Sequence, residues 1–121
     1  MGVAVLTGIR DLRVELADAV GEVIQTETYW PEAFSPPGAL IKAGTPFIEA
    51  GETFREVKVR FQIWILTDDD EEQLEDKVVA VVGRLDDYDI ESIEIEPQID
   101  GGVLAGARLI LTTVVDKEEL F

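Results

Sequence analysis

The sequence contains no cysteine and no histidine, and it has few basic residues. Without cysteine it has no disulfide, no thiolate nucleophile and no zinc site of Cys/His type, and without histidine it lacks the usual imidazole general base. Lysine and arginine number 10 against 26 aspartates and glutamates, which gives a formal net charge of −16. Phosphate binding depends on cations that displace counterions, so this balance argues against a nucleic-acid reader and against binding to an anionic membrane.

Long hydrophobic runs are also missing. The 121 residues are 46% hydrophobic and 30% charged, which is typical of a folded globular chain and not of a disordered or membrane-spanning one. The length fits a single domain, residues 1–121. Residues 1–6 have neither a basic segment nor a long apolar segment of the kind found in secretory signals, so the cytosol is the expected compartment.

Two segments have apolar residues at helical spacing. The first follows Thr7 and is expected to bury Ile9, Leu12, Leu16, Val20 and Val23, with Arg10, Arg13, Glu15, Asp18 and Glu22 outside. The second follows the acidic run 68–72, whose charge suits a helix N-terminus. Its apolar stripe is Leu74, Val78, Val81, Val82 and Leu85, and Gly83 is expected to close the helix.

Residues 55–66 give the clearest strand pattern. Val57, Val59, Phe61, Ile63 and Ile65 are expected to face the core, and Lys58, Arg60, Gln62, Trp64 and Leu66 the opposite side. Shorter strands are expected over 26–30, 39–43 and around 92–96. A returning strand over 103–115 should point Leu109 and Leu111 inward and Arg108 outward.

The remaining segments read as connections. Residues 44–54 are expected to be irregular because glycine and proline punctuate them, 101–102 to form a turn, and 116–121 to be a frayed acidic tail. The predicted fold is therefore α+β: a mostly antiparallel sheet of about five strands with two helices packed on one face, in the order α-β-β-β-α-β-β.

Sites for chemistry are scarce. The acidic run 68–72, with Asp86, Asp87, Asp89 and Glu91, is the densest candidate for a metal site, but it lacks the glycine and glutamate positions of an EF-hand, and a solvated helix start is the favoured interpretation. Neither Ser35 nor Ser92 lies in a nucleophile elbow, and no phosphate-binding glycine motif is present. We expect no enzyme activity, no cofactor and no bound metal.

Apolar residues outside the expected core point instead to a binding surface. Trp64 and Leu66 lie opposite the core face of their strand and need a partner to cover them. Phe47, Ile48 and Phe54 are more apolar than a solvated loop requires. We expect Phe47→Ala or Phe54→Ala to weaken assembly more than it destabilises the subunit.

Two stretches of the sequence carry a family resemblance. Ser-Pro-Pro-Gly-Ala-Leu-Ile at 35–41 and Gly-Thr-Pro-Phe-Ile-Glu-Ala-Gly-Glu-Thr-Phe at 44–54 precede the alternating strand and the acidic helix. In order and spacing the chain resembles the tail terminator (tail completion) proteins of long-tailed bacteriophages, with a lambda-type fold, in the versions found in phages of actinobacteria. The likeness runs from Asp11-Leu12-Arg13 to Leu109-Ile110-Leu111.

The resemblance implies a structural virion protein. Such a subunit forms a homo-oligomeric ring, typically of six copies, on the head-proximal end of the tail tube, where it stops tube polymerisation and joins the connector or stopper protein of the head. DNA passes through the ring without specific binding, and assembly takes place in the host cytoplasm. The residues expected at subunit or tube contacts are Pro46, Phe47, Ile48, Glu49, Phe54, Trp64 and Leu66. A head-tail connector component and a small acidic ligand- or metal-binding module remain as alternatives.

Overall fold

The computed structural model describes residues 8–28, 37–67, 71–99 and 104–120. The elements, in chain order, are helix α2 (Gly8–Gly21), strands β1 (Thr26–Glu27), β2 (Gly38–Ala50) and β3 (Glu56–Thr67), helix α3 (Glu71–Val82), strands β4 (Asp89–Ile99) and β5 (Leu104–Asp116), and the 3₁₀ helix η1 (Lys117–Leu120). The predicted α+β fold and its element order are confirmed.

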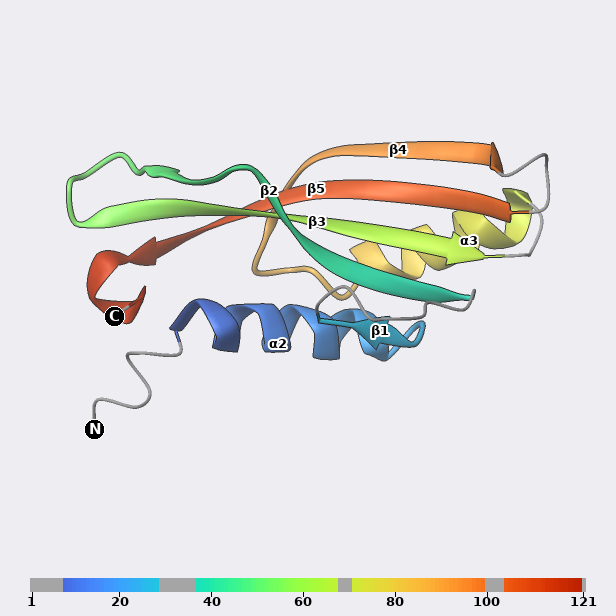
Figure 1. Cartoon of the computed structure of the whole chain (residues 1–121), viewed down its shortest axis with the longest axis horizontal. Helices are drawn as coiled ribbons and strands as arrows, with labels where there is room; N and C mark the ends of the chain where they lie inside the picture. The colour runs from blue at the N-terminus through green and yellow to red at the C-terminus, as the bar shows by residue number, and fades with distance from the viewer. Residues whose placement is uncertain (1–7, 29–36, 68–70, 100–103, 121) are drawn as a thin grey trace.

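The strands form one mixed sheet in the order β1-β2-β3-β5-β4 (Figure 1). Every neighbouring pair is antiparallel except the short β1–β2 pair, which is parallel. The long β3 lies between β2 and β5 and pairs with β5 from Glu56 to Thr67. The sheet therefore has β3 near its centre and β4 as a long edge strand.

The core lies on one face of the sheet. Side chains of both α-helices and the odd-numbered side chains of β3 and β5 form a single buried cluster. The helices contribute Leu16, Val20, Leu74 and Val81, and the strands contribute Val59, Phe61, Ile63, Ile65, Leu109 and Leu111. Burial alternates without interruption along β3, as expected for a strand with one covered face. The predicted inward and outward assignments for this strand and for Leu109 and Leu111 are confirmed.

The segment 44–54 is more regular than predicted. β2 continues to Ala50, and its pairing with β3 shifts register between Ala43 and Ile48, around a cis Thr45–Pro46 peptide. A bulge accommodates extra residues without ending the strand, and proline is tolerated on a strand edge. Only Ala39 and Leu40 of β2 are paired with β1, so Pro46 lies where its missing N–H breaks no pairing with that strand.

Arg13 was predicted to lie outside the core, and this is wrong. Only 7% of its surface is exposed, and its Nη1 donates to the backbone carbonyls of Thr28 at 2.6 Å and Ile41 at 3.0 Å. Arg13 lies three and four residues before Leu16 and Ala17, so it belongs to the same helical face, and its long stem allows the cation to reach carbonyl oxygens. It ties α2 to the β1–β2 edge of the sheet.

The C-terminal segment was predicted to be frayed, and this too is wrong. Residues 117–120 form η1, whose first residue, Lys117, donates its backbone N–H to the carbonyl of Arg55 at 2.8 Å. The Glu118 N–H donates to the Asp116 carboxylate at 3.0 Å. The turn expected at 101–102, the acids 68–70 and the end of the strand expected over 26–30 lie outside the described residues.

Candidate interaction surface on the open face of the sheet

The even-numbered side chains of β3 form the sheet face opposite the core, which we call the open face. They are Glu56, Lys58, Arg60, Gln62, Trp64 and Leu66, all of them half-buried. Cross-strand pairing places Arg108 and Ile110 of β5 beside them, and Glu94 of β4 beyond Arg108. Both described helices pack on the other side, so this face presents side chains in place of a second layer.

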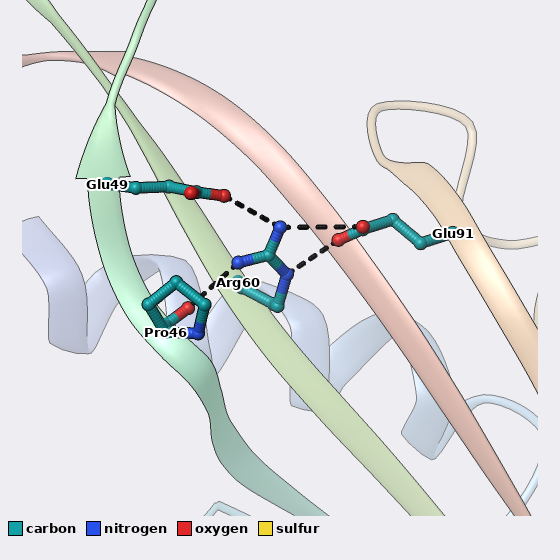
Figure 2. Close-up of polar contacts among 4 residues, drawn as sticks. All are labelled: Pro46, Glu49, Arg60 and Glu91. Atoms are coloured by element: carbon teal, nitrogen blue, oxygen red, sulfur yellow. Dashed lines mark hydrogen bonds and ion pairs between the residues drawn. The ribbon is translucent and has the colours of Figure 1, made fainter.

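Arg60 organises the middle of the open face. Its Nε donates to Glu91 Oε1 at 2.6 Å, its Nη2 lies 2.7 Å from Glu49 Oε1, and its Nη1 donates to the Pro46 carbonyl at 3.0 Å (Figure 2). The hydrogen bond from Arg60 holds the pKa of Glu91 below its ordinary value. One guanidinium thus joins β2, β3 and β4, with β5 passing between the last two.

Glycine is required at position 44 by this arrangement. A Cβ added there would collide with the Cβ, Cγ and Cδ atoms of Arg60. The β2 backbone therefore approaches the arginine stem closely, and the guanidinium emerges beside the bulge to reach the Pro46 carbonyl. Gly44 and Pro46, which favour a loop by local rules, therefore allow β2 to pass close to the Arg60 side chain.

A groove of about 450 Å³ lies at the end of the open face where β3 finishes. It is lined by Trp64, Leu66, Glu94, Ile95, Glu96, Gly106, Ala107 and Arg108. In one cross-strand row Leu66 pairs with Gly106 and Gly106 with Glu96. Glycine contributes no side chain to that row, so a gap remains between Leu66 and Glu96. In the next row Trp64 pairs with Arg108, which forms an ion pair with Glu94.

The Trp64 side chain is held in place by two neighbours. Its Nε1 donates to Gln62 Oε1 at 2.8 Å, and the Lys42 ammonium lies 4.6 Å from the ring centroid. A cation over an indole face is attracted by the ring quadrupole. The indole therefore forms a fixed apolar wall of the groove, beside Leu66.

The opposite end of the sheet carries the β2–β3 turn, residues 51–55, which we call the tip. The Gly51 N–H donates to the Glu56 carbonyl at 3.0 Å, the Glu56 N–H donates to the Thr53 carbonyl at 3.1 Å, and the Thr53 hydroxyl donates to the Glu56 carboxylate at 3.1 Å. These bonds order the turn. At its end, Phe54 is 87% exposed.

Five of the seven residues expected at contacts fall into three places. Trp64 and Leu66 line the groove, Pro46 and Glu49 bond to Arg60, and Phe54 projects from the tip. Ile48 is 41% exposed, whereas Phe47 packs against the core with its ring 5.6 Å from that of Phe61 in an edge-to-face arrangement. Phe47 and Phe54, treated alike in the sequence, thus have different surroundings. Because Phe47 packs against the core, the expectation that Phe47→Ala mainly weakens assembly is corrected: its chief effect should be on subunit stability.

Several residues were not predicted to lie on this face: Lys42, Glu91, Glu94, Glu96 and Gly106. The alternation of β3 placed Arg60, and Arg108 was expected outward, so the cations were within reach of sequence reasoning. The pairing of Arg60 with Glu91 and of Arg108 with Glu94 was not, because these two acids lie on β4, whose register against β5 contains two irregularities that no local pattern specifies.

Comparisons with known proteins do not assign this chain to a family. Neither a scan against protein-family models nor a comparison with curated proteins finds a match to this chain. Within the described ranges, no three acidic side chains are grouped so that they could hold a metal ion, and Asp68, Asp69 and Asp70 lie outside those ranges. None of the described helices has the length and apolar character needed to cross a membrane.

Proposed function

We propose that this chain is a non-enzymatic structural subunit of a bacteriophage tail: a tail terminator that assembles as a ring on the head-proximal end of the tail tube. The observation that carries the proposal is the open face, a sheet face with an apolar groove at Trp64 and Leu66 that both described helices leave uncovered. It accompanies a sequence that resembles tail terminators over most of its length.

The composition of the open face supports a role in protein contact. The groove combines an aromatic and an aliphatic wall with Arg108 and two carboxylates at its rim. Interface centres are enriched in aromatic residues and arginine and are surrounded by polar rims. The Arg60 cluster fixes the neighbouring strands, so the surface is ordered before any partner arrives.

The distribution of charge is compatible with a ring around DNA. The exposed acids of α3 and the turn after it, namely Glu71, Glu72, Glu75, Asp76, Asp86 and Asp87, lie on the helical side of the molecule. In a ring these acids must face outward or into the channel, because like charges repel across a subunit contact. An acidic channel would repel DNA phosphates and let the genome slide. A lumen lined by lysine and arginine would contradict this part of the proposal.

The test is the assembly state, alone and with tail-tube protein. Light scattering after size exclusion, with negative-stain images of the same fraction, is measured at low and moderate salt because screening weakens like-charge repulsion. We expect closed rings, or a monomer that caps tubes and stops their growth. Leu66→Asp should abolish either result, whereas Val79→Asp, on the exposed side of α3, should not. Binding to a head connector with no effect on tubes would favour a neck component instead.

A further inference from the structure

The tip and the groove lie at opposite ends of the same strand. Phe54 precedes the first residue of β3, and Leu66 is next to its last. At about 3.3 Å per residue the two are separated by roughly 40 Å, and Figure 1 shows the β2–β3 turn at one end of the sheet and the end of β3 at the other. A chain cannot place its own Phe54 in its own groove, whereas a second copy can.

The groove has the shape and chemistry to accept the tip. Its volume of about 450 Å³ falls in the range of roughly 300–1,000 Å³ that holds ligands larger than a phenyl ring. Trp64 and Leu66 supply an apolar wall, and aromatic rings gain from offset or edge-on contact. Phe54 is 87% exposed in the free subunit. Transfer of its ring from water into the groove would therefore be favourable.

The charges next to these apolar groups are complementary. Phe54 is followed by Arg55, whose side chain is 72% exposed; its Nη2 lies 4.0 Å from Oε1 of Glu118, which is 83% exposed, and such an ion pair has little strength in water. At the groove, Arg108 is engaged with Glu94, and the carboxylate of Glu96 stands on the same rim. A phenyl ring entering beside Trp64 would carry the Arg55 cation towards these acids.

We infer that the occupant of the groove is Phe54 of a second copy of this chain, with Arg55 against Glu96. The inference rests on the proposed ring, for which it names the subunit contact. Each copy presents both a tip and a groove, so the contact is head-to-tail: it closes into a ring when the rotation per subunit allows and otherwise extends into a filament.

The cysteine-free sequence makes a disulfide test clean. Chains carrying Arg55→Cys are mixed with chains carrying Glu96→Cys and oxidised, which leaves Phe54, Trp64 and Leu66 intact. Docked cysteines face each other at an effective concentration in the millimolar range, against tens of micromolar in free solution, so cross-linked heterodimers should form on the order of a hundredfold faster than for the control pair Val79→Cys and Glu96→Cys. A double variant, Arg55→Cys with Glu96→Cys, should give a ladder of oligomers. Equal rates for the two pairs would overturn the contact.

A charge exchange tests the same contact without cysteine. Arg55→Glu should weaken self-association about tenfold, and Glu96→Arg similarly, while the two together should restore it. Arg10→Glu changes the net charge equally on an exposed position of α2 and should have little effect. Loss in both single variants without recovery in the double variant would contradict the pairing of these side chains.

The outcomes separate this contact from the proposed function. Rings in negative stain without the 55–96 cross-link would overturn the tip-to-groove contact and leave the terminator proposal standing. The cross-link with no rings, and no effect on tail tubes, would support head-to-tail contact and remove the terminator proposal. A chain that stays monomeric, forms no cross-link and leaves tubes growing would overturn both.

Discussion

The two faces of β3 differ in almost every respect although they alternate along one strand. The residues Val57, Val59, Phe61, Ile63 and Ile65 are between 0% and 8% exposed and belong to the core cluster that both α-helices share, whereas their neighbours on the open face are half-buried and mostly polar. The covered face is held by apolar packing. The open face is held by a guanidinium that joins three strands.

The difference indicates that the covered face supplies the stability of the fold and that the open face is available for binding. Apolar burial supplies most of the free energy of folding, and it is concentrated where both helices meet the sheet. Exposed ion pairs contribute little to stability, but they fix side-chain positions and leave polar groups ready for a partner. We therefore expect changes on the covered face to unfold the subunit and changes on the open face to alter what it binds.

The largest effect should come from adjacent residues on the two faces. Phe61 is fully buried, so Phe61→Ala should lower the free energy of unfolding by about 3–5 kcal/mol. Gln62→Ala, one residue along on the open face, should cost less than about 1 kcal/mol, chiefly through the lost bond to Trp64. Denaturant titrations followed by tryptophan fluorescence measure both. Similar losses for the two variants would break the comparison.

Replacement of Arg13 tests whether a buried cation on the covered side contributes as much to the free energy of unfolding as apolar packing does. Arg13→Ala removes the donor to the carbonyls of Thr28 and Ile41 and should cost about 1–3 kcal/mol. The exposed Arg10→Ala on the same helix is the matched control and should be nearly neutral. Equal stability of the two variants in urea would show that the Arg13 bonds are replaced by water.

The two phenylalanines of the 44–54 segment sharpen the comparison further. Phe47 is half-buried against Phe61, so Phe47→Ala should destabilise the subunit by about 1–2 kcal/mol, roughly half the cost of a fully buried ring. Phe54→Ala should change stability by less than about 0.5 kcal/mol because the ring is already in water. Thermal unfolding of both, beside their assembly states, is the measurement. The reverse order of stabilities would contradict the assigned surroundings.

Tyr88, which packs against the core, should make the stability of the fold depend on pH in the alkaline range. Burial, with smaller contributions from Glu15 and Asp87, raises the pKa of Tyr88 to about 12. Since this pKa lies above that of the unfolded chain, about 10, the stabilisation is complete below pH 10 and is lost as the pH rises towards 12. In a Tyr29→Phe background, absorbance of the single tyrosinate reports the titration. A midpoint near 10 in the folded protein would contradict the burial.

Glu91, on the open face, should make the stability of the fold depend on pH in the acidic range. The hydrogen bond from Arg60 lowers the pKa of Glu91, so its stabilisation is present above the pKa of the unfolded chain, about 4.3, and is lost as the pH falls through the folded value. Because the Glu91 side chain is 41% exposed and water screens the pair, we expect less than about 1 kcal/mol. Glu91→Gln should be less stable than the parent at pH 7 and should converge with it in acid. A constant difference at all pH values would rule out the ionised carboxylate as the cause.

The sequence specified the covered face better than the open one. Alternation along β3 and the helical spacing of Leu16 and Val20 depend on local periodicity, which was enough to predict the core and the element order. Charge alone predicts an exposed Arg13, but its position on the helix matches the buried stripe, and the structure buries it. Its partners are backbone carbonyls, which carry no signature in the sequence.

The course of β2 and the groove required information on long-range pairing. Gly44 and Pro46 favour a loop by local rules, and they are accommodated only because β3 supplies a partner and Arg60 occupies the space above Gly44. The groove depends on Leu66, Gly106 and Glu96 falling in one row across three strands. Register between distant strands is set by tertiary packing, so this row could not be read from the sequence.

The order of pairing along the chain has a consequence for synthesis on the ribosome. The tip is closed by the turn 51–55 between neighbouring strands, whereas the groove exists only after β5 has paired with β3 across the whole of α3 and β4. Local hairpins close in about 1–10 μs, and distant strands must first overcome the entropy of closing a long loop. A nascent chain therefore completes its protruding end before its receiving end, and an unfinished copy has no groove with which to receive another.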